Sequence, residues 1–109
     1  MYCRQTNYTV DQLAHKIEYG CPAGEPACFY TNEVGREAAT NGPEADEAVM
    51  LLVHLLQHVD MRVRFVAFAF LVERVPHSRI YEAEHEKIRH FMDDQGNSEI
   101  VQRIYATTT

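Results

Sequence analysis

The sequence is short of positive charge and of long apolar runs. Ten lysine and arginine residues stand against sixteen aspartates and glutamates, so the formal charge at pH 7 is −6. Nucleic acids and anionic membranes bind proteins that concentrate positive charge, so this balance argues against both partners. The longest apolar runs fall short of the roughly 18 residues that a membrane span needs, and Arg62 and Arg64 interrupt the central one. We therefore expect neither a nucleic-acid nor a membrane partner.

Cysteine is also scarce. Cys3, Cys21 and Cys28 form an odd set, and the N-terminus has no apolar signal region. Reduced thiols in a cytoplasmic protein are the default for such a chain. The six residues between Cys21 and Cys28 match no common zinc knuckle. The sequence leaves open whether these thiols are free, paired with one another, or bound to a metal with the help of His15.

No segment alternates polar and apolar residues at period two, which is the signal of a half-buried strand. With 109 residues, 46% of them hydrophobic and 24% charged, the chain has the size and composition of one globular domain. We predict a single all-α domain over residues 1–109. Poor order is expected only at its two ends, residues 1–8 and 107–109.

The spacing of apolar residues predicts about six helices. A capping box of Thr9 and Gln12 opens the first helix, at about 10–19. The two prolines and the glycine of residues 21–28 predict a loop, and a weaker helix with Gly35 at its centre follows at about 31–40. The third helix is expected from Pro43 to Val59, with Val59 on its apolar face, and Asp60 is expected to cap the central helix that follows. The fifth helix is expected at about 79–93 after Ser78, with Ile80 and Tyr81 facing inward, and the last from Ser98.

The central helix, residues 61–75, is apolar nearly all round. Met61, Phe65, Phe68 and Val72 share one side at about 100° per residue, and other apolar residues cover the opposite side. A helix of this kind is buried on most of its surface. We therefore expect the remaining helices to pack around it.

The third and central helices together resemble one unit of a HEAT repeat. Leu52, Leu55 and Leu56 match the leucine pattern of the first helix in that family, and the second helix carries its Asp-x-x-Val-Arg-x-x-Ala signature at Asp60, Val63, Arg64 and Ala67. The resemblance is clear over about residues 43–75. It implies three antiparallel helical hairpins, a role in binding other proteins, and contacts of Asp60 and Arg64 with neighbouring repeats.

The polar side of the third helix is the candidate partner-binding surface. Its apolar face points to the core, and its outer side combines charged and polar groups with one methionine, whose flexible side chain suits an adaptable contact. These outer residues are Glu47, Met50, His54, Gln57 and His58. We expect them to bind another protein, in a non-catalytic module without a cofactor.

Two other interpretations of the polar residues remain. His54 and His58 stand at i and i+4, a spacing that suits two metal ligands, so a metal site or a small helical enzyme built on them or on the cysteine and histidine set is the alternative function. The Glu82-x-x-His85 pair resembles a di-iron motif, but it lies off the apolar stripe of its helix. Neither pair has an evident third ligand, and we expect no metal site.

Glu84 falls within the apolar stripe of the fifth helix. A carboxylate there must be paired, protonated, or placed at the rim of a cleft. Arginines 62, 64 and 74 of the central helix are the nearest candidates, so we predict a Glu84–arginine pair between hairpins. The ends of a short helical stack are adhesive unless they are capped, which makes a homodimer through a terminal hairpin a further expectation.

Overall fold

The computed structural model of the chain describes residues 8–19 and 26–108, and these residues form helices and turns without a strand. The all-α prediction is therefore confirmed. Cys3 and Cys21 lie outside the described residues. So do most of the residues at the two ends that were expected to be poorly ordered. In chain order the elements are α1 (Val10–Tyr19), α2 (Ala27–Ala38), α3 (Ala45–Leu55), α4 (Met61–Glu73), the 3₁₀ helix η1 (His77–Arg79), α5 (Glu82–Asp93), the 3₁₀ helix η2 (Gln95–Asn97) and α6 (Ser98–Thr108).

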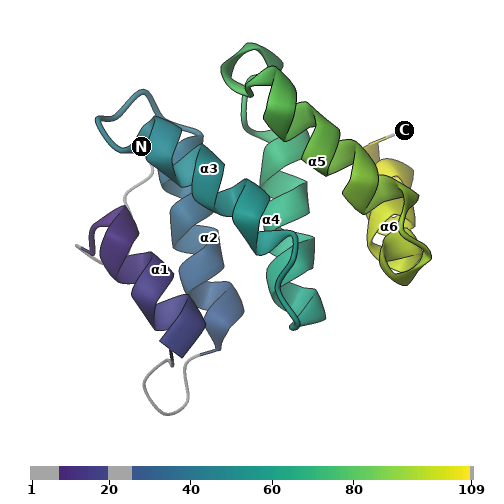
Figure 1. Cartoon of the computed structure of the whole chain (residues 1–109), viewed down its shortest axis with the longest axis horizontal. Coiled ribbons are helices and arrows are strands. Elements are labelled where there is room, and N and C mark those ends of the chain that lie inside the picture. Colours follow the sequence, from purple (N-terminus) through teal and green to yellow (C-terminus); the bar gives the residue numbers. More distant parts are fainter. Residues whose placement is uncertain (1–7, 20–25, 109) are drawn as a thin grey trace.

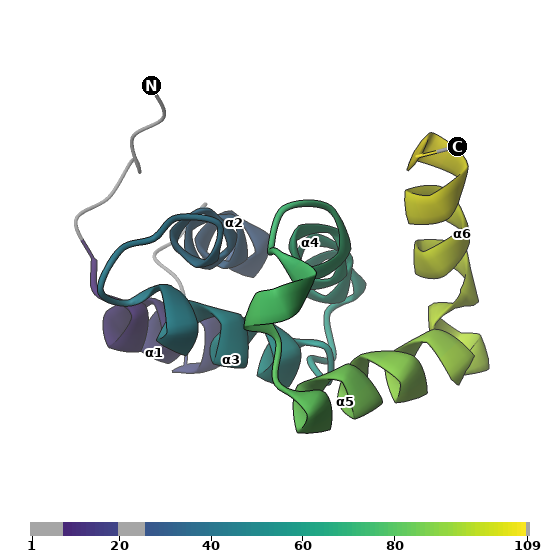
Figure 2. The same ribbon diagram turned by 90° about the horizontal axis from the view of Figure 1, so that it is seen from above.

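Helices that follow one another in the chain pack as pairs, α1 with α2, α3 with α4, and α5 with α6 (Figure 1). Figure 2 shows α1, α3 and α5 along one side of the molecule and α2 and α4 along the other, with α6 standing at the far end. Contacts also join α1 to α3, α3 to α5, α2 to α4, and α4 to α6. This arrangement agrees with the predicted three hairpins. No helix in the described part of the chain is long and apolar enough to cross a membrane.

The predicted capping box fixes the start of α1. The Thr9 amide donates to Gln12 Oε1 at 2.8 Å, and the Gln12 amide donates to Thr9 Oγ1 at 3.2 Å. Two amides at the helix start, which have no partner within the helix, are thereby satisfied. The helix then buries Val10, Leu13 and Ile17.

The second helix begins four residues earlier than the sequence predicted, at Ala27 directly after Pro26. Proline is favoured at the start of a helix, so Pro26, the second proline of the expected loop, ends that loop. Gly35, which had weakened the prediction, lies against the ring of Phe70 from α4. A Cβ atom built on Gly35 would stand 2.2 Å from Phe70 Cδ2. Glycine therefore permits the close approach of α2 and α4.

The third helix is shorter than predicted and ends at Leu55. Residues 56–60 form the turn to α4, so the prediction that Val59 lies on the apolar face is wrong: 92% of its surface is exposed. The reason is local. Asp60 has the extended backbone of a helix-capping residue, and its amide donates to His58 Nδ1 at 3.0 Å. That backbone interrupts the helical conformation, so α3 and α4 cannot form one continuous helix.

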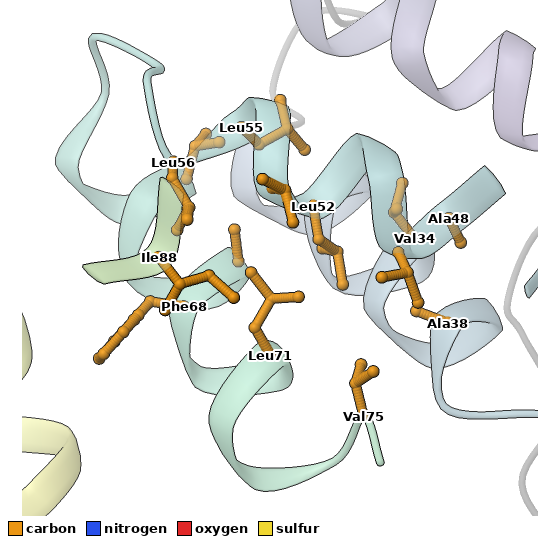
Figure 3. Packing of buried hydrophobic residues seen from close by; sticks show 14 of the residues in the cluster. Val34, Ala38, Ala48, Leu52, Leu55, Leu56, Phe68, Leu71, Val75 and Ile88 are labelled. Atoms are coloured by element: carbon orange, nitrogen blue, oxygen red, sulfur yellow. The ribbon is translucent and has the colours of Figure 1, made fainter. Parts of the chain in front are cut away.

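The fourth helix holds the centre of the apolar core. Val63, Ala67, Phe68 and Leu71 are buried, and its other faces are mostly half-buried. The helix packs on α2 and α3, and the ring of Phe68 lies against Phe91 of α5, with 4.9 Å between the ring centroids. Figure 3 shows the side chains of α2, α3 and α4 meeting in one cluster, which Ile88 of α5 joins.

The fifth helix starts three residues later than predicted, because the 3₁₀ helix η1 precedes it. The guanidinium of Arg79 donates to the carbonyl oxygens of Ala38 and Thr40, so η1 is tied to the end of α2. Ile80 is buried as expected. Tyr81, predicted to face inward, is exposed, and that prediction is wrong.

Candidate functional site

The candidate site is the outer face of α3, made of Glu47, Met50, His54, Gln57 and His58. Glu47, Met50 and His54 lie on α3, and Gln57 and His58 lie in the turn after it. All except the half-buried His58 are exposed. Met50 exposes 44% of its surface. The five residues therefore form one polar surface with an apolar residue within it.

A pocket of about 360 Å³ adjoins this face, at the point where the C-terminal ends of α1 and α3 approach each other. Two of its residues, Tyr19 and Val59, expose 76% and 92% of their surfaces. The complete lining is Glu18, Tyr19, His54, Leu55, Gln57, His58 and Val59. The outer face of α3 thus continues onto α1 and gains an aromatic and an aliphatic side chain.

Sequence reasoning missed Tyr19 and Val59. Tyr19 follows the apolar stripe of Val10, Leu13 and Ile17 but falls outside it, and that offset was a signal for an exposed ring. Val59 directly precedes the helix-capping Asp60, so it had to leave the preceding helix before the chain reversed. In both cases the residue type suggested burial and the position indicated exposure.

Hydrogen bonds hold the polar groups of this pocket. His54 Nε2 lies 3.2 Å from Glu18 Oε1 and joins α3 to α1. The imidazole of His15 lies against the ring of Tyr19, with 4.9 Å between the ring centroids. His58 accepts the Asp60 amide through Nδ1. The two histidines of the possible metal clip are thus engaged by different partners, and in the described residues no group of three or more His, Cys, Asp or Glu is placed to hold a metal.

Asp60 caps α4 beside this site, as its position in the sequence predicted. Its Oδ1 accepts the Arg62 amide at 2.8 Å, and the Arg62 side chain lies against the same carboxylate. Burial raises the pKa of the Asp60 carboxyl, but the hydrogen bonds from the Arg62 amide and side chain and the charges of Arg62 and His58 outweigh it. The net effect lowers the pKa below its ordinary value. The same pairing raises the pKa of Arg62.

Arg64 joins the turn after α3 to the C-terminal helices. Its Nη1 donates to the carbonyl oxygens of His58 at 2.8 Å and Val59 at 3.0 Å, and its Nε donates to Asn97 Oδ1 at 3.1 Å. The buried Asn97 in turn donates to the carbonyl oxygen of Phe91 at 3.1 Å. One guanidinium therefore positions the backbone of the candidate site and contacts the 3₁₀ helix between α5 and α6.

The predicted Glu84–arginine pair is not formed. Glu84 is buried as expected, but its carboxylate lies 3.4 Å from Nζ of Lys87, one turn further along α5. The arginines have other partners: Arg62 lies on Asp60, and Arg64 uses its donors on the α3–α4 turn and Asn97. Because a local lysine could reach the carboxylate, burial of Glu84 did not require a partner from another hairpin.

The remaining candidate groups lie elsewhere. Cys28 is free and half-buried in a groove that Met61 and Phe65 also line. Glu82 is exposed, and His85 of the same motif stacks on His77 at 4.2 Å between ring centroids. These residues lie on the α4–α6 side of the molecule, apart from the outer face of α3. Comparison of this chain with protein-family models, with curated proteins and with solved structures finds no match.

Proposed function

We propose that this chain is a non-catalytic module that binds a partner protein through the outer face of α3. The observation that carries the proposal is the exposure of Tyr19 and Val59 on the pocket that His54 also lines, together with the exposure of Met50 one turn before His54 on α3. Large apolar side chains that remain exposed together, among polar groups, are typical of protein-binding surfaces. The rigid helix pairs beneath them would present this surface with little loss of conformational entropy on binding.

The HEAT-like resemblance supports the same function. Paired helices stacked in two rows, with Arg64 reaching from one pair to the next, are what such a repeat would need. Proteins built in this way present the outer surfaces of their helices to other proteins. The partner would be a different protein, and a second copy of this chain is the other occupant to be distinguished.

The experiment compares partner recovery by two matched double variants. Met50→Glu with His54→Glu places two carboxylates on the proposed surface. Met61→Glu with His90→Glu places two on α4 and α5, and it is a close control because Met61 has the same 44% exposure as Met50. Far-UV circular dichroism and the urea midpoint of each variant check that it folds.

The tagged wild type is used to recover and identify bound proteins under reducing conditions. The α3 variant should lose most of the recovered partner, because two charges then stand in a desolvated contact, and the control should retain it. Equal recovery by wild type and the α3 variant would reject the proposed surface. Light scattering after size exclusion distinguishes a second copy of the chain, which would give a dimer that only the α3 variant dissociates.

A further inference from the structure

We infer that the pocket between the ends of α1 and α3 receives a lysine or arginine side chain of the partner protein. This inference rests on the proposed function, because it names what the partner would insert into that surface. The pocket combines three features that favour a cationic side chain: the polarity of two helix ends, an exposed aromatic ring, and the Glu18 carboxylate, which lies on the imidazole of His54. The nearby guanidinium of Arg64 is engaged by the carbonyl oxygens of His58 and Val59 and by Asn97.

The helix ends favour a cation. Both α1 and α3 reach the pocket with their C-terminal ends, at Tyr19 and Leu55. The aligned peptide dipoles of a helix place partial negative charge at its C-terminus, where cations are stabilised. Figure 2 shows α1 and α3 along the same side of the molecule, and residues from the ends of both helices line the one pocket.

The exposed side chains of the pocket fit the shape of a lysine or arginine side chain. Tyr19 presents a ring that is 76% exposed, and a guanidinium or ammonium over the face of a tyrosine is attracted by its π electrons. Val59 lies on the same pocket and offers an apolar contact for the methylene stem that every lysine and arginine carries. Neither side chain has an evident role in the core.

Glu18 would form an ion pair with the partner's lysine or arginine side chain. Its carboxylate is the only acid among the described residues that line the pocket, and its present partner there is the imidazole of His54. Both side chains are substantially exposed, 41% for Glu18 and 65% for His54. An exposed pair of this kind is weak and is readily exchanged for another cation. The incoming side chain would therefore take Glu18 from His54.

The test uses two peptides that differ in one charge, acetyl-Leu-Arg-Leu-amide and the same peptide with citrulline, which keeps the shape of arginine and loses its charge. Each is titrated into the ¹⁵N-labelled chain. The arginine peptide should shift the amides of Glu18, Tyr19 and His54 and bind about fivefold more tightly than the citrulline peptide.

Glu18→Gln should bring the arginine peptide to the citrulline level. The control, Glu86→Gln, removes the same charge from an exposed ion pair with Arg89 on α5 and should change nothing. Equal binding of the two peptides, shifts confined to other residues, or an equal loss in the control variant would overturn the inference. If the Met50→Glu/His54→Glu variant still loses its partner in that event, the proposed surface stands and the cation pocket falls.

Discussion

The four helices α1–α4 and the pair α5–α6 differ in how they are held. Within the first group, α2 contacts α1, α3 and α4, and α3 contacts α1 and α4. Leu13, Val34, Leu52 and Val63 are almost fully buried between them. The main contacts of the second group with the first are fewer: α5 meets α3, and α6 meets α4. The first group is enclosed on several sides, and the second is attached along one.

Three cavities mark the junction between the two groups. One of about 510 Å³ lies between the end of α4, η1, α5 and α6. Another of about 370 Å³ lies between the α3–α4 turn, α5 and η2, and a third of about 300 Å³ lies between α2, α4 and α6. Hydrogen bonds from Arg64 and Arg79 cross this junction. The comparison indicates that the first group, which carries the candidate site, is packed on more sides. The second group joins the same apolar core along one side, and polar contacts of Arg64 and Arg79 help to orient it.

The largest effect should come from removing one core side chain in each group. Leu52→Ala deletes an enclosed side chain of α3, and Ile100→Ala deletes a similarly buried one of α6. We expect Leu52→Ala to lower the free energy of unfolding by about 4 kcal/mol and Ile100→Ala by about 2 kcal/mol, because the less enclosed site can relax into its cavity.

Urea unfolding followed by circular dichroism measures both values. Each substitution removes a branched apolar side chain of the same size, so a difference between the two losses in free energy of unfolding reflects the surrounding packing. Equal losses, or a greater loss at Ile100, would contradict the difference between the two groups.

Arg64→Ala tests the polar connection between the groups. The substitution leaves Asn97 Oδ1 and the carbonyl oxygens of His58 and Val59 without this donor. We expect a loss of about 2 kcal/mol in the free energy of unfolding. Hydrogen exchange should also accelerate at the amides of α5 and α6 more than at those of α1 and α2.

The matched control is Arg62→Ala, two residues earlier on the same helix. Its side chain is exposed and pairs with the neighbouring Asp60, so its loss should have little effect on stability or on exchange in α5 and α6. If exchange rises evenly along the chain in Arg64→Ala, the arginine stabilises the whole fold and does not orient the second group in particular.

The elements themselves were predictable because their signals are local. The capping box at Thr9 and the capping Asp60 set two helix starts, and apolar spacing identified all six helices. The ends of the helices and their packing were harder to predict. The continuation of α2 through Gly35 depends on close packing against the Phe70 ring of α4, and the late start of α5 depends on Arg79 reaching the end of α2. Both contacts join residues more than thirty positions apart, so no pattern within one helix contains them.

The candidate site was predictable in part for the same reason. The outer face of α3 follows from helical periodicity, and the structure leaves four of its five residues exposed. The contribution of α1 depends on which helices are neighbours, and a sequence does not state that Tyr19 and Val59 meet. The partner of Glu84, by contrast, was missed although it lies close to Glu84 in the sequence. The buried carboxylate pairs with a lysine one turn away on its own helix, whereas the prediction placed its partner on another helix.

The smallest effect concerns Asp60, which lies between α3 and α4. Asp60→Ala removes the acceptor of the Arg62 amide and should cost about 1 kcal/mol at neutral pH, the usual value of a helix cap. Asp60→Asn keeps an acceptor oxygen and loses only the charge. It should therefore lie between the wild type and the alanine variant.

The pH dependence separates the charge of Asp60 from its geometry. The pKa of this carboxyl is lower in the folded chain than its ordinary value of 3.8, so the ionised form stabilises the fold. That contribution is complete above the pKa of the unfolded chain and is lost as the pH falls through the lower folded value. The stability difference between wild type and Asp60→Asn should thus be constant from about pH 7 to about pH 5 and shrink below about pH 4. A difference that persists unchanged at the acid end would mean that Asp60 acts by capping geometry alone, and that the Arg62 charge beside it contributes nothing to the fold.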